Sequence, residues 1–274
     1  MTDGRATDGA DLTSTANPRV KALVRLRTRR ARAEAGVTLV EGHDELRLAL
    51  EAGVRPSELY WAPSLAGERA DLVHDVRARG ARVTSVSRDV FGKIAYRESP
   101  DGWLAVVPAP ERPLADLELG PRPLVLVAEG IEKPGNVGAM LRTAEACGAD
   151  AVVAASAGTD FGNPNVVRAS KGTVFAVPVA AAGSDDVLAW LRARGLRIAV
   201  TTPAGTTRLD RSTLDGPVAL VVGTEATGVT DLWLACADET VVIPMRGRVN
   251  SLNAATAAAL ALYEATRQRD ALSG

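Results

Sequence analysis

The feature of this chain that most constrains its fold is a series of short apolar runs in its second half, separated by stretches with helical periodicity. Because the runs are almost continuously apolar, they are typical of strands in a parallel sheet that helices cover on both faces. The runs are residues 124–128, 151–154, 174–179, 196–200, 218–222 and 240–243. We therefore expect an α/β domain over residues 124–274, ending in an Ala-rich helix over residues 253–269.

The part of the chain before this domain predicts three further segments. Residues 1–16 are small and polar without periodicity, which favours a disordered tail. Residues 17–107 predict a small α/β domain, with strands at 37–40, 58–61, 82–86 and 103–107 and helices at 44–52 and 66–79. Residues 108–123 form a Pro-rich segment, which indicates a linker of limited flexibility.

A basic helix is expected at the start of the small domain. Asn17 and Pro18 suit the N-cap and the first helical position, and no acidic residue follows until Glu34. Such a run is usually a solvated helix face, but it is also a candidate surface for RNA phosphates. Because the net charge is −1 and the isoelectric point is near 6.2, a polyanion site has to come from local clustering of this kind. The basic residues of the run are Arg19, Lys21, Arg25, Arg27, Arg29, Arg30 and Arg32.

Missing motifs argue against several common classes of protein. The chain has no GxGxxG and no GxxxxGK[ST] sequence, which counts against NAD enzymes, P-loop NTPases and Rossmann-type methyltransferases. The absence of GxSxG weakens the hypothesis that the chain is an α/β-hydrolase. The two cysteines and the two histidines are isolated from one another, so we expect no structural zinc site and two buried free thiols. Without a signal peptide or a transmembrane-length apolar run, the protein is expected to be soluble and cytoplasmic.

Three polar segments lie near the ends of predicted strands, and each of them has an ordinary structural explanation. Asn136 can simply cap a helix, with Arg142 a surface charge near Glu145. Glu225 can be a solvated residue in a glycine-bracketed turn. The run 251–253, Ser-Leu-Asn, can be the N-terminal cap of the last helix. Taken singly, these segments leave structural and functional interpretations open.

Taken together, the three segments resemble the sequence motifs of the SpoU methyltransferases, a branch of the trefoil-knotted SPOUT superfamily. The resemblance covers residue 124 to the C-terminus, and it is looser before that, where the chain is similar to the ribosomal-protein-like RNA-binding domain often fused to this catalytic domain. Within the family, the chain is most similar to enzymes that protect antibiotic-producing bacteria by methylating 23S rRNA. Two departures from the common pattern are Lys171 and Asn250, both candidates to lie near RNA. The matching runs are Pro134-Gly135-Asn136-Val137-Gly138 with Arg142-Thr143, Gly223-Thr224-Glu225 with Gly228, and Ile243-Pro244-Met245 with Ser251-Leu252-Asn253.

This resemblance implies a homodimeric, S-adenosylmethionine-dependent RNA 2′-O-ribose methyltransferase that needs no metal, acting on a uridine in 23S rRNA and conferring resistance to a ribosome-targeting antibiotic. It implies that backbone groups of Gly223, Ile243, Met245 and Leu252 hold the cofactor, with Thr201 and Thr202 lining the same pocket. It also implies catalytic roles for Arg142, Asn136, Glu225, Ser251 and Asn253. Since a guanidinium rarely gives up its proton, we expect Arg142 to hold phosphate and stabilise a developing alkoxide rather than act as a base.

Two alternatives stay open at this point. A tRNA methyltransferase would use the same chemistry, although the separate N-terminal domain favours rRNA. A catalytically inactive, RNA-binding knot protein would have the same fold. The presence of Arg142, Glu225, Ser251 and Asn253 argues against this second alternative.

Overall fold

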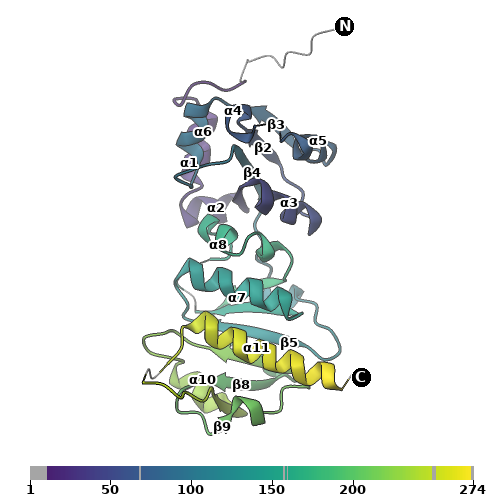
Figure 1. Cartoon of the computed structure of the whole chain (residues 1–274), viewed down its shortest axis with the longest axis vertical. Helices are drawn as coiled ribbons and strands as arrows, with labels where there is room; N and C mark the ends of the chain where they lie inside the picture. The colour runs from purple at the N-terminus through teal and green to yellow at the C-terminus, as the bar shows by residue number, and fades with distance from the viewer. Residues whose placement is uncertain (1–10, 68, 157, 159, 249–250, 273–274) are drawn as a thin grey trace. The chain divides into compact units, whose positions relative to one another are not determined.

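The computed structural model describes residues 11–67, 69–156, 158, 160–248 and 251–272, which form two compact units (Figure 1). The first unit is Met1–Ala109 with Gly162–Pro164, and the second is Pro110–Phe161 with Asn165–Gly274. Within the described residues, no helix has the length and apolar character needed to cross a membrane.

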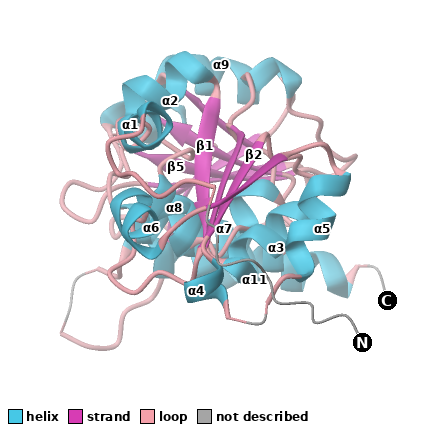
Figure 2. Cartoon of the chain, turned by 90° about the horizontal axis from the view of Figure 1, so that it is seen from above, coloured by secondary structure: helices cyan, strands magenta, loops and turns pink. Residues whose placement is uncertain are grey.

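The first unit is built on a four-stranded sheet with the order β1-β4-β2-β3. Strand β4 pairs antiparallel with β1 and β2, whereas β2 and β3 are parallel. Helices α1 and α6 lie on one side of β1 and β2, and α3 and α5 lie on the other (Figure 2). The strands are β1 (Val37–Glu41), β2 (Glu58–Trp61), β3 (Arg82–Ser85) and β4 (Trp103–Pro108), and the helices are α1 (Pro18–Arg25), α2 (Arg29–Ala35), α3 (His43–Glu51), α4 (Pro63–Ala66), α5 (Asp71–Ala78) and α6 (Arg88–Ile94).

Two helices in the first unit are shorter than the sequence patterns predict, whereas α3 has the length that was predicted. The basic run forms α1 and α2 rather than one helix, because the Thr28 hydroxyl accepts a hydrogen bond from the amide of Ala31 at 3.3 Å and starts a new helix there. The predicted helix 66–79 is realised as α5, which begins only at Asp71, and the helices α4 and α6 were not predicted.

The predicted disordered tail, residues 1–16, is wrong for residues 11–16. Leu12 is buried at 6% exposure and forms a bridge with Val86, exchanging backbone hydrogen bonds with Ser85 and Ser87 at 3.1 Å each. The remainder of the predicted tail, residues 1–10, lies outside the described residues.

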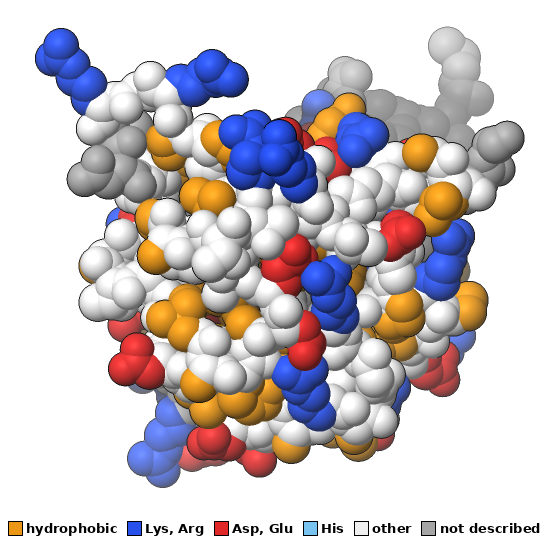
Figure 3. Space-filling model, turned by 90° about the horizontal axis from the view of Figure 1, so that it is seen from below, with side chains coloured by type: hydrophobic (Ala, Val, Ile, Leu, Met, Phe, Trp, Pro, Cys, Tyr) orange, Lys and Arg blue, Asp and Glu red, His pale blue; other side chains and the backbone are white. Residues whose placement is uncertain are grey.

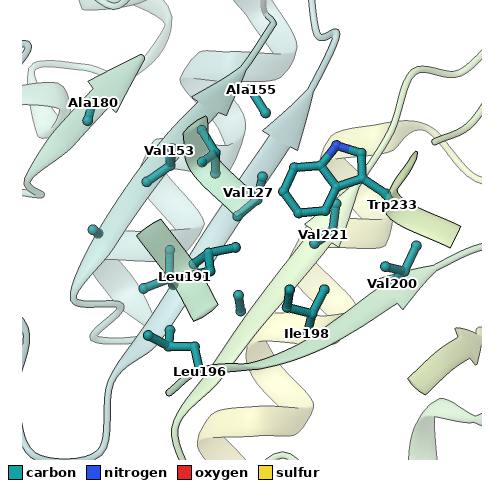
Figure 4. Close-up of a cluster of buried hydrophobic side chains, with 14 of the residues drawn as sticks. Val127, Val153, Ala155, Ala180, Leu191, Leu196, Ile198, Val200, Val221 and Trp233 are labelled. Carbon is teal, nitrogen blue, oxygen red and sulfur yellow. The ribbon is translucent and has the colours of Figure 1, made fainter. Parts of the chain in front are cut away.

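The second unit confirms the predicted parallel α/β fold. Its seven-stranded sheet has the order β7-β6-β5-β10-β8-β11-β9, and all neighbouring strands are parallel. Helices α7 and α11 pack together on one face, and α9 and α10 bury apolar side chains against the other (Figure 4). The strands are β5 (Leu124–Glu129), β6 (Ala151–Ala155), β7 (Val179–Ala182), β8 (Arg197–Thr201), β9 (Thr207–Arg208), β10 (Val218–Val222) and β11 (Glu239–Val242), and the helices are α7 (Pro134–Ala146), α8 (Pro164–Ala169), α9 (Ser184–Ala193), α10 (Asp231–Cys236) and α11 (Ala254–Ala271).

Two expectations for the second unit need correction. The predicted strand 174–179 is wrong over most of its length, since Thr173–Phe175 is a 3-10 helix and β7 begins only at Val179. The preceding Gly172 has a φ of 86°, which turns the chain at this point. The cysteines, Cys147 and Cys236, are free thiols as expected, but they are half-buried rather than buried.

The Pro-rich segment packs onto the second unit. Leu117 is 1% exposed and belongs to the core beneath α9, and the amide of Arg112 donates to the carbonyl of Val179 at 2.9 Å. This segment therefore adds to the apolar core of the second unit as well as connecting the two.

Candidate active site

The carboxyl ends of three adjacent strands bring the predicted cofactor residues to one edge of the sheet. Strand β8 pairs with β10 and β11, with Val200 opposite Val221 and Thr201 opposite Val241. The Thr201 hydroxyl donates to the carbonyl of Val221, and the Thr202 amide to that of Val241, both at 2.9 Å. The chain therefore leaves the sheet at Thr202, Gly223 and Ile243 along the edge where open α/β sheets bind their ligands.

The three motifs meet in a hydrogen-bonded group that we call the three-loop cluster: Lys133, Asn136, Glu225 and Asn253. The Glu225 carboxylate accepts from Lys133 Nζ at 2.7 Å, from Asn136 Nδ2 at 3.0 Å and from Asn253 Nδ2. Asn253 Nδ2 also lies 3.1 Å from Asn136 Oδ1. The structure brings Asn136, Glu225 and Asn253 together as expected. Lys133 was not among the predicted site residues.

The cluster overturns one of the ordinary structural explanations, the capping of α7 by Asn136. Asn136 does not cap α7, because Lys133 occupies the N-cap position. Asn253 serves both purposes, since its Oδ1 accepts from the amide of Ala255 at 2.9 Å and caps α11 while its Nδ2 joins the cluster. The hydrogen bond from Lys133, followed by that from Asn136, lowers the pKa of Glu225 below its ordinary value. Glu225 is therefore ionised near neutral pH and is a weak proton acceptor.

Arg142 and Ser251 do not join this cluster. Both side chains are exposed, and Arg142 makes no hydrogen bond or ion pair to any residue that the structure describes, including Glu145. Arg142 follows Asn136 by six positions on α7, so helical geometry turns it about 120° away from Asn136 around the helix axis. The guanidinium is thus available to a ligand or a partner. Asn250 lies outside the described residues, and Lys171 is an exposed residue with a φ of 53°.

The residues expected to hold the cofactor combine apolar side chains with available backbone groups. Met245 is 36% exposed, and Ile243 and Leu252 are half-buried. Among the described residues, Gly223, Met245 and Leu252 make no hydrogen bond to another backbone group. Gly223 packs so tightly that a Cβ there would lie 2.2 Å from the carbonyl of Gly228. This set of donors, acceptors and apolar surface fits S-adenosylmethionine, whose adenine needs both apolar contact and edge hydrogen bonds.

Part of the predicted RNA-binding run is committed to the structure of the first unit. Arg19 Nη2 donates to Glu58 at 3.1 Å and to Thr84 at 3.0 Å. Arg27 donates to the carbonyl of Ala95 at 2.8 Å and lies over the ring of Tyr96. These two guanidinium groups hold separate elements of the unit together.

The other basic residues of the run differ in exposure. Arg32 is 4% exposed and donates to the carbonyls of Leu26 and Arg27 at 3.1 Å. Arg30 is exposed and pairs with Glu34 at 2.7 Å. Lys21, Arg25 and Arg29 are exposed on α1 and α2. The surface that the run offers to a polyanion is therefore narrower than its composition indicates.

One end of the second unit carries charge of both signs. Figure 3 views the end of the second unit that carries β9 and α10, and acidic and basic side chains are interspersed there. No group of three or more His, Cys, Asp or Glu residues suited to a metal ion occurs in the described part of the chain.

Comparison with known proteins identifies the family of this chain. Residues 123–263 match the SpoU rRNA Methylase family, and residues 17–105 match the MRM3-like substrate binding domain. The chain belongs to the SpoU rRNA methylase family. The predicted enzyme class, an S-adenosylmethionine-dependent RNA 2′-O-methyltransferase, is confirmed at this level.

Similar proteins include two 23S rRNA methyltransferases from Streptomyces. The chain is 32% identical to the 23S rRNA (adenosine(1067)-2′-O)-methyltransferase of Streptomyces laurentii, covering 92% of this chain and 93% of that protein. It is also 32% identical to the 23S rRNA (uridine(2479)-2′-O)-methyltransferase of Streptomyces viridochromogenes, covering 89% and 87%. The crystal structure of the SpoU methyltransferase AviRb from Streptomyces viridochromogenes with AdoMet superimposes with a TM-score of 0.83 at 30% identity, covering 93% and 98%.

Proposed function

We propose that this enzyme methylates the 2′-hydroxyl of a uridine ribose in 23S rRNA. The observation that carries the proposal is the three-loop cluster, because it joins all three motifs beside the strand ends where Gly223 and Ile243 leave the sheet. A surface that needed only to bind RNA would have no requirement for this polar network next to a set of groups suited to S-adenosylmethionine.

The residues of the site divide the chemistry between them. S-adenosylmethionine supplies an electrophilic methyl group on a sulfonium. Arg142, exposed and available, holds the phosphate of the target nucleotide and stabilises the negative charge that develops on the ribose oxygen. Glu225 stays ionised and holds Lys133, Asn136 and Asn253 in position. Ser251, two residues before Asn253, supplies a further hydroxyl at the start of α11.

The first unit provides the RNA-binding surface in this proposal. Lys21, Arg25 and Arg29 contact phosphates, whereas Arg19, Arg27 and Arg32 maintain the helices that carry them. We further propose that the second unit has the trefoil knot of its family and forms a homodimer through the knotted region. The proposed site of action is the cytoplasm, where ribosomes are assembled.

The choice of uridine rests on the similarity to the uridine-2479 enzyme. Within the antibiotic-resistance branch, the sequence resembles the avilamycin-resistance methyltransferase, and we propose that methylation protects the ribosome from such a drug. The relative that acts on adenosine 1067 is equally identical. The target base is therefore determined by mapping the methylated position in the RNA.

The test is to treat unmodified 23S rRNA and total tRNA with the enzyme and labelled S-adenosylmethionine, and then to map 2′-O-methyl positions. A single new uridine methylation in 23S rRNA is the expected result. Methylation confined to tRNA, or the absence of transfer despite cofactor binding, contradicts the proposal. A raised inhibitory concentration of the drug in a sensitive strain expressing the enzyme, but not Arg142→Ala, tests the resistance role.

A further inference from the structure

A buried carboxyl group lies just behind the site, outside the three-loop cluster. Glu129 is the last residue of β5 and is only 4% exposed. One of its oxygens accepts a hydrogen bond from the Thr230 amide at 2.9 Å, and the other accepts from the Thr230 hydroxyl at 2.6 Å. Both oxygens therefore accept from one residue that is 101 positions away in the sequence. A buried polar group is retained at low cost only when it is paired in this way.

Glu129 fastens one end of a loop whose other end is already fixed. We call residues 223–230, between β10 and α10, the cofactor loop. At its entry, Val222 of β10 stands in register with Ala128 of β5. At its exit, Thr230 is bound to Glu129, the next residue of β5. Both ends of the cofactor loop are thus attached to the same strand end.

The exit of the loop is also joined to the core. Trp233 on α10 is fully buried, and its amide donates to the carbonyl of Thr230 at 3.1 Å. Figure 4 shows its indole beside Val221, and Val127 belongs to the same buried cluster. Thr230, the last residue of the cofactor loop, is therefore joined to a helix that Trp233 anchors in the core.

Close packing transmits the position of Thr230 to Gly223. Thr224 and Gly228 exchange two backbone hydrogen bonds of 3.0 Å within the loop. Because a Cβ on Gly223 would lie 2.2 Å from the carbonyl of Gly228, these two glycines are in direct contact. Releasing Thr230 allows Val229 and Gly228 to move, and Gly223 must move with them.

We propose that Glu129 is a positioning residue that sets the affinity for S-adenosylmethionine by holding Thr230, and through it the backbone of Gly223. This inference rests on the proposed binding of the cofactor by the loop at Gly223. Glu129 itself contacts neither the cofactor nor the RNA in this scheme. Its effect is on the geometry of the loop before any ligand arrives.

The test measures binding of S-adenosylhomocysteine by calorimetry and amide hydrogen exchange in the ligand-free, full-length protein. Glu129→Gln is expected to weaken binding about tenfold, the equivalent of one hydrogen bond to a charged group. It should also speed exchange at the amides of Thr224, Gly228 and Thr230. Thr230→Val, which keeps the shape but removes the hydroxyl, should give a similar loss, and Thr230→Ser should restore most of the affinity. The double variant should lose no more than Glu129→Gln alone.

Glu239→Gln is the matched control. Glu239 is the first residue of β11 and lies at the amino end of that strand, whereas the site lies at the carboxyl ends. It accepts hydrogen bonds from Arg197 at 2.8 Å and Ser212 at 2.6 Å. Its loss should lower thermal stability without changing the affinity for S-adenosylhomocysteine.

The possible outcomes separate the inference from the proposed function. Unchanged affinity in both Glu129→Gln and Thr230→Val, with a wild-type protein that binds, overturns the inference alone. Equal loss of affinity in Glu239→Gln also overturns it, because the effect would then be general destabilisation. Failure of the wild-type protein to bind S-adenosylhomocysteine overturns the proposed function and the inference with it. If Glu129→Gln does not fold, Thr230→Val and Thr230→Ser decide the question.

Discussion

The three-loop cluster and the basic run of the first unit contrast in how charged and polar residues are used. In the cluster, side chains from α7, the cofactor loop and the start of α11 meet at hydrogen-bonding distance, although 117 positions separate Asn136 from Asn253. In the basic run, residues adjacent in sequence are directed to different tasks, since Arg27 and Arg32 hold backbone carbonyls while Lys21 and Arg25 face solvent.

This difference shows what dispersed motifs and a run of like charges can each predict. Motifs dispersed over the chain, each at the end of a strand, predict a shared location because parallel strands end at the same edge of a sheet. A run of like charges predicts only composition, because the helix break at Thr28 and the acceptors nearby decide which guanidinium groups remain exposed. Removing charge is therefore expected to act on chemistry in the second unit and on either stability or RNA binding in the first.

The largest expected effect is at Arg142. Arg142→Ala should reduce single-turnover methyl transfer on the order of 100–1,000-fold, the usual loss for one electrostatic stabiliser of a transition state. Arg142→Lys should recover little, because an ammonium cannot reproduce the planar fork of donors. Calorimetry should find unchanged S-adenosylhomocysteine binding in both variants.

Glu145→Ala, an exposed substitution on the same helix, is the control for Arg142. It should leave the rate unchanged. If Arg142→Ala methylates RNA at close to the wild-type rate, Arg142 is only a surface residue and its catalytic assignment is refuted.

Asn253→Ala should have the next largest effect, because this residue both caps α11 and joins the three-loop cluster. We expect weaker cofactor binding and slower methyl transfer, together with about 1 kcal/mol less free energy of unfolding from the lost cap. Denaturant titration and calorimetry measure the two effects separately.

Asn17→Ala provides a matched cap variant in the first unit, since the Asn17 side chain accepts from the amide of Arg19 at 2.9 Å. It should lose comparable stability but bind S-adenosylhomocysteine normally. Equal cofactor affinity in the two variants would show that Asn253 is a helix cap and nothing more.

The same contrast explains which strands and site residues the sequence predicts and which it does not. Apolar runs located most strands of the second unit because burial on both faces requires them. The run 174–179 misled because apolar content reports burial rather than conformation, and Val174 is buried in a 3-10 helix. In the site, the motifs located Asn136, Glu225 and Asn253, but Lys133 is a long exposed side chain whose partner depends on how the loops approach each other. The sequence shows Glu129 only as an acidic residue at the end of an apolar strand. Its contact with Thr230, which suggests its role, is visible only in the structure.

A smaller effect is expected from the basic residues that remain exposed. Replacing Lys21, Arg25 and Arg29 with Ala should weaken RNA binding and lower the slope of log affinity against log salt by about two to three, if each residue neutralises one phosphate. Cofactor binding should not change. Arg27→Ala, by contrast, should lower thermal stability because Arg27 holds the carbonyls of Lys93 and Ala95.

The control for the triple variant is the replacement of Arg47, Arg77 and Arg82, which are exposed residues of α3, α5 and β3. It makes the same change in net charge on other elements of the first unit. A salt slope that falls equally in both triple variants would show a general field effect and contradict a phosphate-binding surface on α1 and α2.

The smallest expected effect is on pH dependence, and it tests the role of Glu225. The hydrogen bond from Lys133 lowers the pKa of Glu225, so its stabilising contribution is present above the unfolded-state pKa and is lost as pH falls through the folded-state pKa. The difference in melting temperature between wild type and Glu225→Gln should therefore be constant near neutral pH and vanish in strong acid. Because the carboxylate is already ionised and engaged, the pH profile of methyl transfer from about pH 6 to 9 should keep its shape in Glu225→Gln, even where the rate falls. An inflection present in the wild type and missing in Glu225→Gln would identify Glu225 as the proton acceptor, and would mean that RNA and cofactor binding reverse the pKa shift set by Lys133.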